Sequence, residues 1–197
     1  MNLFNAFPAI PDLKGLQYIP DFITNQEQKK MLQSIDHATW LDDLKRRVQH
    51  YGYKYDYRKR NIDRSMRIGS LPKWSSFIIN RLLEKGIIDF NPDQLIINEY
   101  EPGQGILAHI DCEPCFEQTI LSLTLNSACL MHFINKADNT RKEELYLAPK
   151  SLLIMSDEAR YQWKHGIVGR KTDKIEGQRI PRQRRVSLTF RKVILDA

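Results

Sequence analysis

Cysteine is scarce in this sequence. It has three, Cys112, Cys115 and Cys129, and an odd number in a chain without a secretory start excludes the disulfide framework of small secreted domains. Cys112 and Cys115 form a C-x-x-C motif, but no second pair is present to complete a zinc site. We therefore expect two free thiols at these two positions.

Long hydrophobic runs are missing too. No apolar stretch approaches the roughly 20 residues of a membrane span, and the opening residues Met1–Asn5 lack the basic and apolar regions of a signal peptide. We therefore expect no membrane association and an intracellular protein, which would be cytoplasmic or, in a eukaryote, nuclear, and not secreted. Internal repeats and low-complexity segments are also absent, which excludes a repeat architecture.

The bulk composition is ordinary for a soluble globular protein, with 42% hydrophobic and 27% charged residues. A chain of 197 residues is long enough for one domain with a substantial core, and not comfortably long enough for two. We expect a single domain over residues 1–197 and, from this size, a monomer.

Positive charge is in excess, with 30 Lys and Arg against 24 Asp and Glu and a net charge of +6. Two stretches carry much of it: Lys45, Arg46, Arg47, Lys54, Arg58, Lys59, Arg60, Arg64 and Arg67, and then Arg170, Lys171, Lys174, Arg179, Arg182, Arg184 and Arg185. Each could be a solvated loop. Two such stretches on either side of the central region favour a nucleic-acid partner.

The first half of the chain contains helix signals. A short strand is predicted over Leu16–Ile19, and the side chain of Thr24 or Asn25 can cap a helix over residues 26–35. A second helix is predicted over residues 72–83, opened by a proline and followed by a glycine. We expect both helices to pack outside a sheet.

From Gln94 onward, short apolar or alternating runs recur with turn residues between them. Strands are predicted over Leu95–Glu101, Gly105–Ile110, Thr119–Leu125, Leu130–Asn135, Glu144–Ala148, Ser151–Ser156, Trp163–Val168 and Arg185–Val193. Eight short strands after an α/β start indicate an α+β fold with a double-stranded β-helix, or jelly-roll, core over residues 94–197. Residues 1–93 would then carry the N-terminal helices.

Two histidines and one carboxylate lie within these predicted strands. His109 and Asp111 are two residues apart, so a regular strand would place them on one face, and the fold would bring His165 beside them. This is the ligand set of a non-haem Fe(II) oxygenase. H-x-D alone occurs by chance in many chains, and a structural role is the default for each of the remaining histidines.

The case for iron depends on the order of several motifs. Asn98-Glu99-Tyr100 precedes H-x-D, a His-Gly follows it, and Arg185-Val186-Ser187-Leu188-Thr189-Phe190-Arg191 closes the series. This arrangement resembles the AlkB family of Fe(II)- and 2-oxoglutarate-dependent dioxygenases over Asn98–Arg191. The resemblance implies Fe(II), 2-oxoglutarate as co-substrate, and O2.

The resemblance also implies roles for individual residues. His109, Asp111 and His165 would be the iron ligands. Arg185 would form a salt bridge to the distal carboxylate of 2-oxoglutarate, since a planar guanidinium can hold a carboxylate through two parallel hydrogen bonds.

Further contacts to the co-substrate follow from the same motifs. Asn98 and Tyr100 would hydrogen-bond 2-oxoglutarate, and Arg191 would lie near the carboxylate that chelates iron. Ser187 stands where the family often has Asn, which affects one polar contact to 2-oxoglutarate and leaves the iron site unaffected.

A tyrosine-rich segment precedes the core. Its tyrosines at alternating positions are Tyr51, Tyr53, Tyr55 and Tyr57, and Arg46 and Arg47 lie just before them. On an extended segment the rings would line one face, which could stack on a nucleobase while the arginines hold phosphates, or could simply pack on the core. In the AlkB family this region is the nucleotide-recognition lid. The sequence of this segment is similar to that of the lid in family members that hydroxylate a wobble-uridine side chain in tRNA.

Two charged residues near the expected site are weaker candidates for substrate contacts. Glu113 matches a position from which some family members present a carboxylate to the base, and Arg160 lies shortly before His165. Both could be ordinary exposed charges. The basic segment Gly169–Arg184 is predicted to be a long loop that could clamp a nucleic-acid backbone.

Three functions remain open. The first is oxidative demethylation of N-alkylated bases in single-stranded DNA or RNA, with release of succinate, CO2 and formaldehyde, which requires an unpaired or flipped base. The second is hydroxylation of a modified wobble base in tRNA or of a protein side chain. The third is a jelly-roll binding module that holds a metal without redox chemistry, and the R-x5-R motif argues against it because a simple binder has no need of a 2-oxoglutarate clamp.

Overall fold

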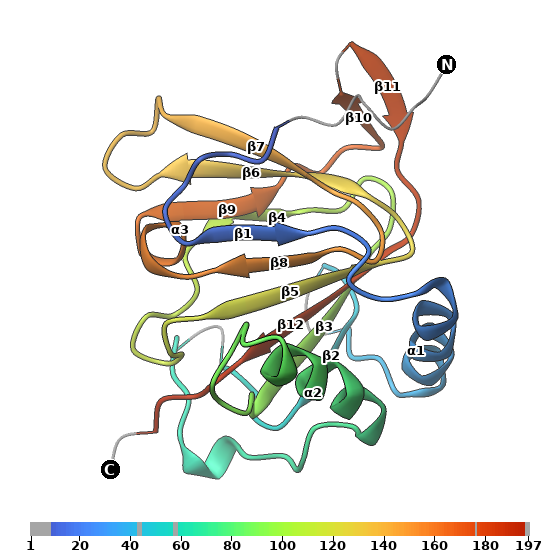
Figure 1. Ribbon diagram of the computed structural model, residues 1–197, viewed down its shortest axis with the longest axis vertical. Coiled ribbons are helices and arrows are strands. Elements are labelled where there is room, and N and C mark those ends of the chain that lie inside the picture. The colour runs from blue at the N-terminus through green and yellow to red at the C-terminus, as the bar shows by residue number, and fades with distance from the viewer. Residues whose placement is uncertain (1–8, 43–44, 57–58, 176, 196–197) are drawn as a thin grey trace.

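The computed structural model describes residues 9–42, 45–56, 59–175 and 177–195 (Figure 1). Its first part contains β1 (Leu16–Ile19), α1 (Asn25–His37), β2 (Val48–Tyr51), the 3-10 turns η2 (Arg64–Met66) and η3 (Lys73–Ser75), and α2 (Ser76–Glu84). The following strands are β3 (Gln94–Tyr100), β4 (Ile106–His109), β5 (Ile120–Leu125), β6 (Cys129–Asn135), β7 (Lys142–Leu147) and β8 (Leu152–Met155). The chain continues with α3 (Asp157–Tyr161), β9 (Trp163–Ile167), β10 (Thr172–Ile175), β11 (Gln178–Pro181) and β12 (Arg185–Arg191).

Two antiparallel sheets form the core. The larger has the strand order β1-β8-β5-β12-β3-β2, and the smaller has the order β4-β9-β6-β7 (Figure 1). Neighbours in the sheets are mostly distant in the sequence, as in a jelly roll, and the predicted double-sheet core is confirmed.

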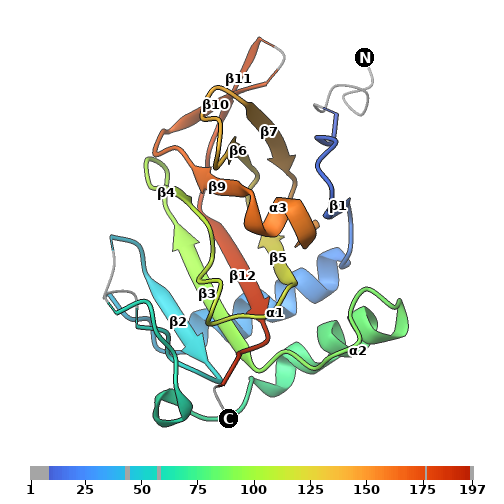
Figure 2. The same ribbon diagram turned by 90° about the vertical axis from the view of Figure 1, so that its left-hand side faces the viewer.

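Helices α1 and α2 contribute to a hydrophobic cluster on one face of the larger sheet (Figure 2). Met31 and Ile35 of α1 and Ile78 of α2 lie in this cluster with strand residues such as Leu123 and Leu188. A second cluster, which contains side chains of both sheets, includes the fully buried Phe133 and Phe116. No helix in the described part of the chain is long and apolar enough to cross a membrane.

Helix α1 begins where its capping residues predict. Thr24 Oγ1 accepts a hydrogen bond from the backbone N–H of Glu27, and the Glu27 carboxylate accepts one from the N–H of Thr24, which together form a capping box. Arg81 of α2 donates to the same carboxylate at 2.5 Å and to the carbonyl of Phe22. This ion pair links the two helices, because Glu27 belongs to α1 and Arg81 belongs to α2.

The tyrosine-rich segment does not form one extended face, so that interpretation is wrong. Gly52 turns the chain at φ +78°, and a Cβ there would lie 1.7 Å from the carbonyl oxygen of Asp93. Tyr51 therefore packs against the cluster that contains the helices, whereas Tyr53 and Tyr55 are buried in the other cluster. The fourth tyrosine, at position 57, lies outside the described residues.

Two other expectations need correction. The predicted loop Gly169–Arg184 contains the paired strands β10 and β11, which project beyond the two main sheets (Figure 1). Cys112 and Cys115 are not free thiols, because their sulfur atoms are bonded at 2.20 Å. The turn in which Cys115 donates its N–H to the Cys112 carbonyl brings their Cα atoms within 5.2 Å, a separation that permits a disulfide.

Candidate active site

A cavity of about 580 Å³ contains the side chains that the sequence motifs single out. Strand β12 shows how it is built, because its side chains alternate between two environments. Arg185, Ser187 and Thr189 line the cavity, whereas Val186 and Leu188 lie in the cluster that contains the helices. Strand β3 alternates in the same way, and the register pairs Arg185 with Tyr100 and Ser187 with Asn98.

His109, Asp111 and His165 meet on the wall of this cavity. His109 on β4 is paired directly with His165 on β9, and their rings lie 4.6 Å apart. Asp111 follows β4, and its Oδ2 lies 3.4 Å from Nε2 of His165. One ligand atom from each of the three residues lies within 4.8 Å of the other two. The predicted triad is therefore assembled as a group of potential metal ligands.

An irregularity in β4 orients His109. The register of β4 against β9 shifts between Ile106 and His109, and Gly166 permits the close approach, since a Cβ there would lie 2.7 Å from the backbone of Ala108. The bend brings the Leu107 carbonyl within 2.8 Å of His109 Nδ1. Because a carbonyl can only accept, Nδ1 carries the proton and Nε2 keeps the lone pair that a metal needs.

The charges at the triad suit a divalent cation. Burial alone would raise the pKa of Asp111, but the positive charge of Arg191, whose Nη2 lies 2.5 Å from Oδ1, is the largest effect that opposes it, and that pKa is held below its usual range. Burial lowers the pKa of His165 to about 3, so its ring is neutral at physiological pH. Asp111 Oδ2 is buried without a hydrogen-bond partner, which fits a carboxylate oxygen that binds a metal.

Arg185 offers a matching site for an anion. Its Nη2 donates to Thr124 Oγ1 at 2.8 Å, and its guanidinium carbon lies 5.5 Å from the ring centre of Tyr100. The side chain is 3% exposed, and its Nε and Nη1 have no hydrogen-bond partner within the protein. Buried guanidinium donors are normally satisfied, so the arrangement fits a carboxylate held at this end of the cavity.

The other predicted co-substrate residues also line the cavity. Asn98 Oδ1 accepts a hydrogen bond from Arg46 Nε at 2.8 Å, and the Arg46 guanidinium lies over the ring of Tyr100. Ser187 Oγ lies 3.3 Å from Ser122 Oγ within hydrogen-bond distance. The predicted set on β3 and β12 is therefore brought together around one space.

The structure separates the predicted substrate residues into two groups. Arg46 and Tyr55 line the cavity. Arg47 does not, because its guanidinium pairs with Glu99 at 2.5 Å and lies over the ring of Trp40. Tyr51 and Tyr53 also lie outside the lining.

Glu113 and Arg160 are not placed to touch a substrate in the cavity. Glu113 is exposed and pairs with Lys136 at 3.4 Å. Arg160 is 2% exposed and donates to the backbone carbonyls of Asp111 and Cys112 at 2.9 and 3.3 Å. Arg160 thus holds the chain at the metal-ligand loop, a role that its position in the sequence did not reveal.

Some cavity residues were missed as individual sites. Lys45 and Arg60 line the cavity, and both belong to the basic stretch seen in the sequence. Thr124 does not line the cavity but accepts a hydrogen bond from Arg185; it lies two residues from Ser122 on β5, a spacing that could have placed it on the same face. Leu107 lines the cavity and is 89% exposed. It sits at the β4 irregularity, which sequence patterns do not show.

Comparison with known proteins identifies the class to which this fold and site belong. The family model of the 2OG-Fe(II) oxygenase superfamily matches residues 15–191. An Arabidopsis thaliana protein named "Alkylated DNA repair protein ALKBH8 homolog" is 41% identical, over 92% of this chain and 59% of its own length. A Xenopus tropicalis protein named "tRNA (carboxymethyluridine(34)-5-O)-methyltransferase alkbh8" is 39% identical, over 94% of this chain and 32% of its own. The chain thus spans less than two thirds of the length of both relatives.

A solved structure shares the fold. "The structure of OsALKBH1" superimposes with a TM-score of 0.68 at 16% sequence identity, over 90% of this chain and 98% of that one. The chain belongs to the 2OG-Fe(II) oxygenase superfamily and, within it, to the AlkB family. The family resemblance of the motifs is confirmed. The protein is an enzyme that uses Fe(II), 2-oxoglutarate and O2, so the alternative of a metal-holding binding module falls away.

Proposed function

We propose that this enzyme oxidises a carbon substituent on a base of single-stranded nucleic acid, and that its substrate is a modified wobble uridine in tRNA. His109, Asp111 and His165 would hold Fe(II), which supplies the oxidising chemistry when bound with 2-oxoglutarate and O2. Arg185 would hold the distal carboxylate of 2-oxoglutarate, because its unpaired buried donors face the same cavity as the triad.

Neighbouring residues would keep these groups in place. Arg191 neutralises one oxygen of Asp111 and leaves the other for the metal. Thr124 fixes the Arg185 guanidinium, and Tyr100 covers one side of it. The chain's contribution is therefore to orient an ionised carboxylate, two imidazoles and a guanidinium before any ligand arrives.

The positive charge of the cavity is the main observation that favours this substrate. Lys45, Arg46 and Arg60 line it in addition to Arg185 and Arg191, and in the described part of the chain Asp111 is the only carboxylate in the lining. Such a cavity attracts phosphates and anionic base substituents. It repels a cationic base, and 1-methyladenine and 3-methylcytosine are both cationic at neutral pH.

The names of the relatives support both candidate reactions. The Xenopus tropicalis name refers to a carboxymethyluridine at tRNA position 34, a base with an anionic substituent, which agrees with the charge of the cavity. The Arabidopsis thaliana name refers to repair of alkylated DNA, so oxidative demethylation of an N-alkylated base in DNA or RNA is the second candidate. The positive cavity favours the first.

Nucleoside mass spectrometry distinguishes the two. The enzyme would be incubated with Fe(II), ascorbate and 2-oxoglutarate, and with total tRNA or with single-stranded DNA and RNA that carry 1-methyladenine or 3-methylcytosine. We expect a new hydroxylated nucleoside in tRNA, absent with the Asp111→Ala variant, and intact methyl groups on the oligonucleotides. Loss of those methyl groups with unchanged tRNA would establish the demethylase instead.

Two adjacent arginines test the contact with nucleic acid. Arg46 lines the cavity, whereas Arg47 pairs with Glu99 outside it. We expect Arg46→Gln to weaken tRNA binding and to reduce the slope of log affinity against log salt by about one. Arg47→Gln is the matched control and should leave that slope unchanged. Equal slopes for wild type and Arg46→Gln would contradict a phosphate contact at Arg46.

A further inference from the structure

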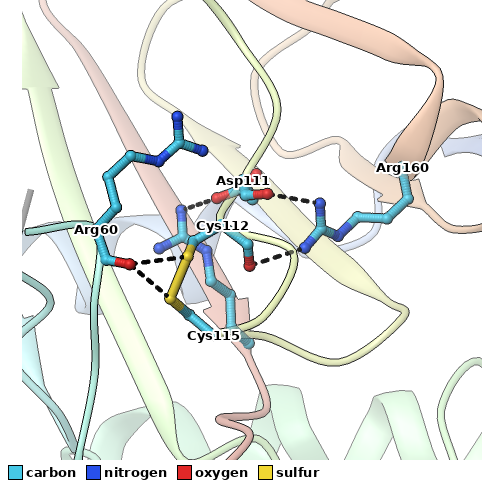
Figure 3. The surroundings of a disulfide bond; sticks show 6 residues. Arg60, Asp111, Cys112, Cys115 and Arg160 are labelled. Atoms are coloured by element: carbon cyan, nitrogen blue, oxygen red, sulfur yellow. Dashed lines mark hydrogen bonds and ion pairs between the residues drawn. A yellow bond between two sulfur atoms is a disulfide. The ribbon is translucent and has the colours of Figure 1, made fainter.

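The disulfide lies directly beside the candidate metal ligands. Cys112 follows Asp111 in the sequence and lines the cavity, whereas Cys115 is buried and is not part of the lining. Figure 3 shows the bond between the two cysteines next to Asp111. Arg160 donates to the carbonyls of both Asp111 and Cys112, so the backbone at the start of this turn is held. Formation or reduction of the disulfide should therefore mainly affect the segment that contacts the sulfur atoms and is not hydrogen-bonded by Arg160.

That segment is the one around Arg60. Both sulfur atoms contact the carbonyl oxygen of Arg60: Sγ of Cys112 lies 3.3 Å from it and Sγ of Cys115 lies 3.4 Å from it (Figure 3). Arg60 has a φ of +50°, in the left-handed region that non-glycine residues adopt at a cost. The Arg60 side chain lines the cavity, and its charge acts on the Tyr55 hydroxyl. The cysteine pair thus touches the backbone of a residue that shapes the substrate end of the cavity.

We propose that Cys112 and Cys115 form a reversible dithiol–disulfide site that controls the position of Arg60. A disulfide sulfur carries no proton and has nothing to donate to the Arg60 carbonyl. In the dithiol, each S–H can donate to that oxygen and hold Arg60 in its left-handed conformation. Oxidation removes these donors, so Arg60 is held less firmly in the oxidised enzyme.

The oxidant is a low-molecular-weight disulfide that reaches Cys112 through the cavity. The Cys112 thiolate attacks one sulfur of that disulfide, which forms a mixed disulfide and releases one small thiol. The Cys115 thiolate then attacks the Cys112 sulfur and displaces the second small thiol. Two thiols of the protein are oxidised by two electrons, and one small disulfide is reduced to two thiols. An excess of small thiol reverses both steps.

The first test needs no enzyme activity. The iron-loaded protein would be equilibrated without O2 in buffers of reduced and oxidised glutathione, quenched in acid, unfolded and alkylated, and its peptides analysed by mass spectrometry. We expect Cys112 and Cys115 to lose their alkylation together as the buffer becomes oxidising, while Cys129 stays alkylated throughout. A pair that stays free, or stays bonded, at every ratio would overturn the proposal.

Two single variants test the order of attack. Cys115→Ser should accumulate a glutathione adduct on Cys112, because the resolving thiol is missing. Cys112→Ser should leave Cys115 without an adduct, since Cys115 does not line the cavity. Adducts of equal yield on both cysteines would contradict access through the cavity.

The coupling to Arg60 rests on the proposed function and has its own readout. We expect the KM for tRNA to rise about fivefold on oxidation, the effect of losing a weak hydrogen bond. In the Cys112→Ser/Cys115→Ser double variant the hydroxyls can still donate to the Arg60 carbonyl, so its KM should not respond to glutathione. Cys129→Ser is the matched control and should keep the response. An unchanged KM in the wild type, with normal thiol titration, would overturn the coupling alone.

Discussion

Removing the one hydroxyl that holds the Arg185 guanidinium should weaken the binding of 2-oxoglutarate. Thr124 is 1% exposed, and its Oγ1 accepts a hydrogen bond from Arg185 Nη2 at 2.8 Å. In Thr124→Val a methyl group replaces the hydroxyl, so β5 keeps its shape while the guanidinium loses the group that fixes it. A hydrogen bond to a charged partner contributes about 1.5–3 kcal/mol, and each 1.4 kcal/mol is a factor of about ten in affinity. We expect affinity for 2-oxoglutarate to fall about 10- to 100-fold.

The assay is calorimetric titration of 2-oxoglutarate into the Mn(II)-loaded protein. Thr140→Val is the control, since Thr140 lies in an exposed turn and donates to Asp138, and it should leave the affinity unchanged. Arg185→Lys should weaken binding further than Thr124→Val, because an ammonium does not reproduce a planar pair of donors. If Thr124→Val folds normally and binds 2-oxoglutarate as tightly as the wild type, Thr124 does not position the anion-binding guanidinium and the reasoning fails.

Three further predictions concern stability, metal binding and substrate contact. Arg81 lowers the pKa of Glu27 to about 2, so the stabilisation from this pair is present above about pH 4.5 and is lost as the pH falls towards 2. Glu27→Gln should lower the free energy of unfolding by about 1 kcal/mol at pH 7. Urea unfolding should show that the difference between wild type and variant becomes smaller as the pH is lowered. Arg160→Met should weaken Mn(II) affinity about tenfold, measured by calorimetry, because Arg160 holds the backbone of the ligand loop; unchanged affinity would remove that role. Leu107→Ala should raise the KM for tRNA several-fold by removing apolar area at the cavity, whereas Ile68→Ala, an exposed residue outside the lining, should not.

The strands and the triad could be predicted because their signals are local. Short apolar or alternating runs predicted β3, β5 and β12 to within a few residues of their observed bounds. The H-x-D motif and the distal histidine have a fixed order in the sequence, so the resemblance carried them without any knowledge of the fold. The structure brings them together by pairing β4 with β9.

The remainder depends on contacts between distant segments. The register shift in β4 that turns the Leu107 carbonyl towards His109 arises from pairing with β9. The sequence makes Arg160 a candidate substrate contact or an ordinary exposed charge, because it shows only how far Arg160 lies from His165 along the chain. Its burial against Asp111 is a product of the tertiary fold. The sequence did not predict the Cys112–Cys115 bond for a different reason. The odd number of cysteines and the lack of a secretory start argue against a disulfide, and the turn that brings the two residues together is not evident from the sequence.

The coupling of 2-oxoglutarate turnover to base oxidation tests the proposed activity and its metal site most directly. Succinate and modified nucleoside would be counted in the same reaction with Fe(II), O2 and tRNA, for the wild type and for Asp111→Asn, which keeps the size of the side chain but loses its charge. We expect equal amounts of succinate and hydroxylated nucleoside in the wild type and neither in the variant. Wild-type levels of both products in the Asp111→Asn protein would contradict the assignment of the metal site.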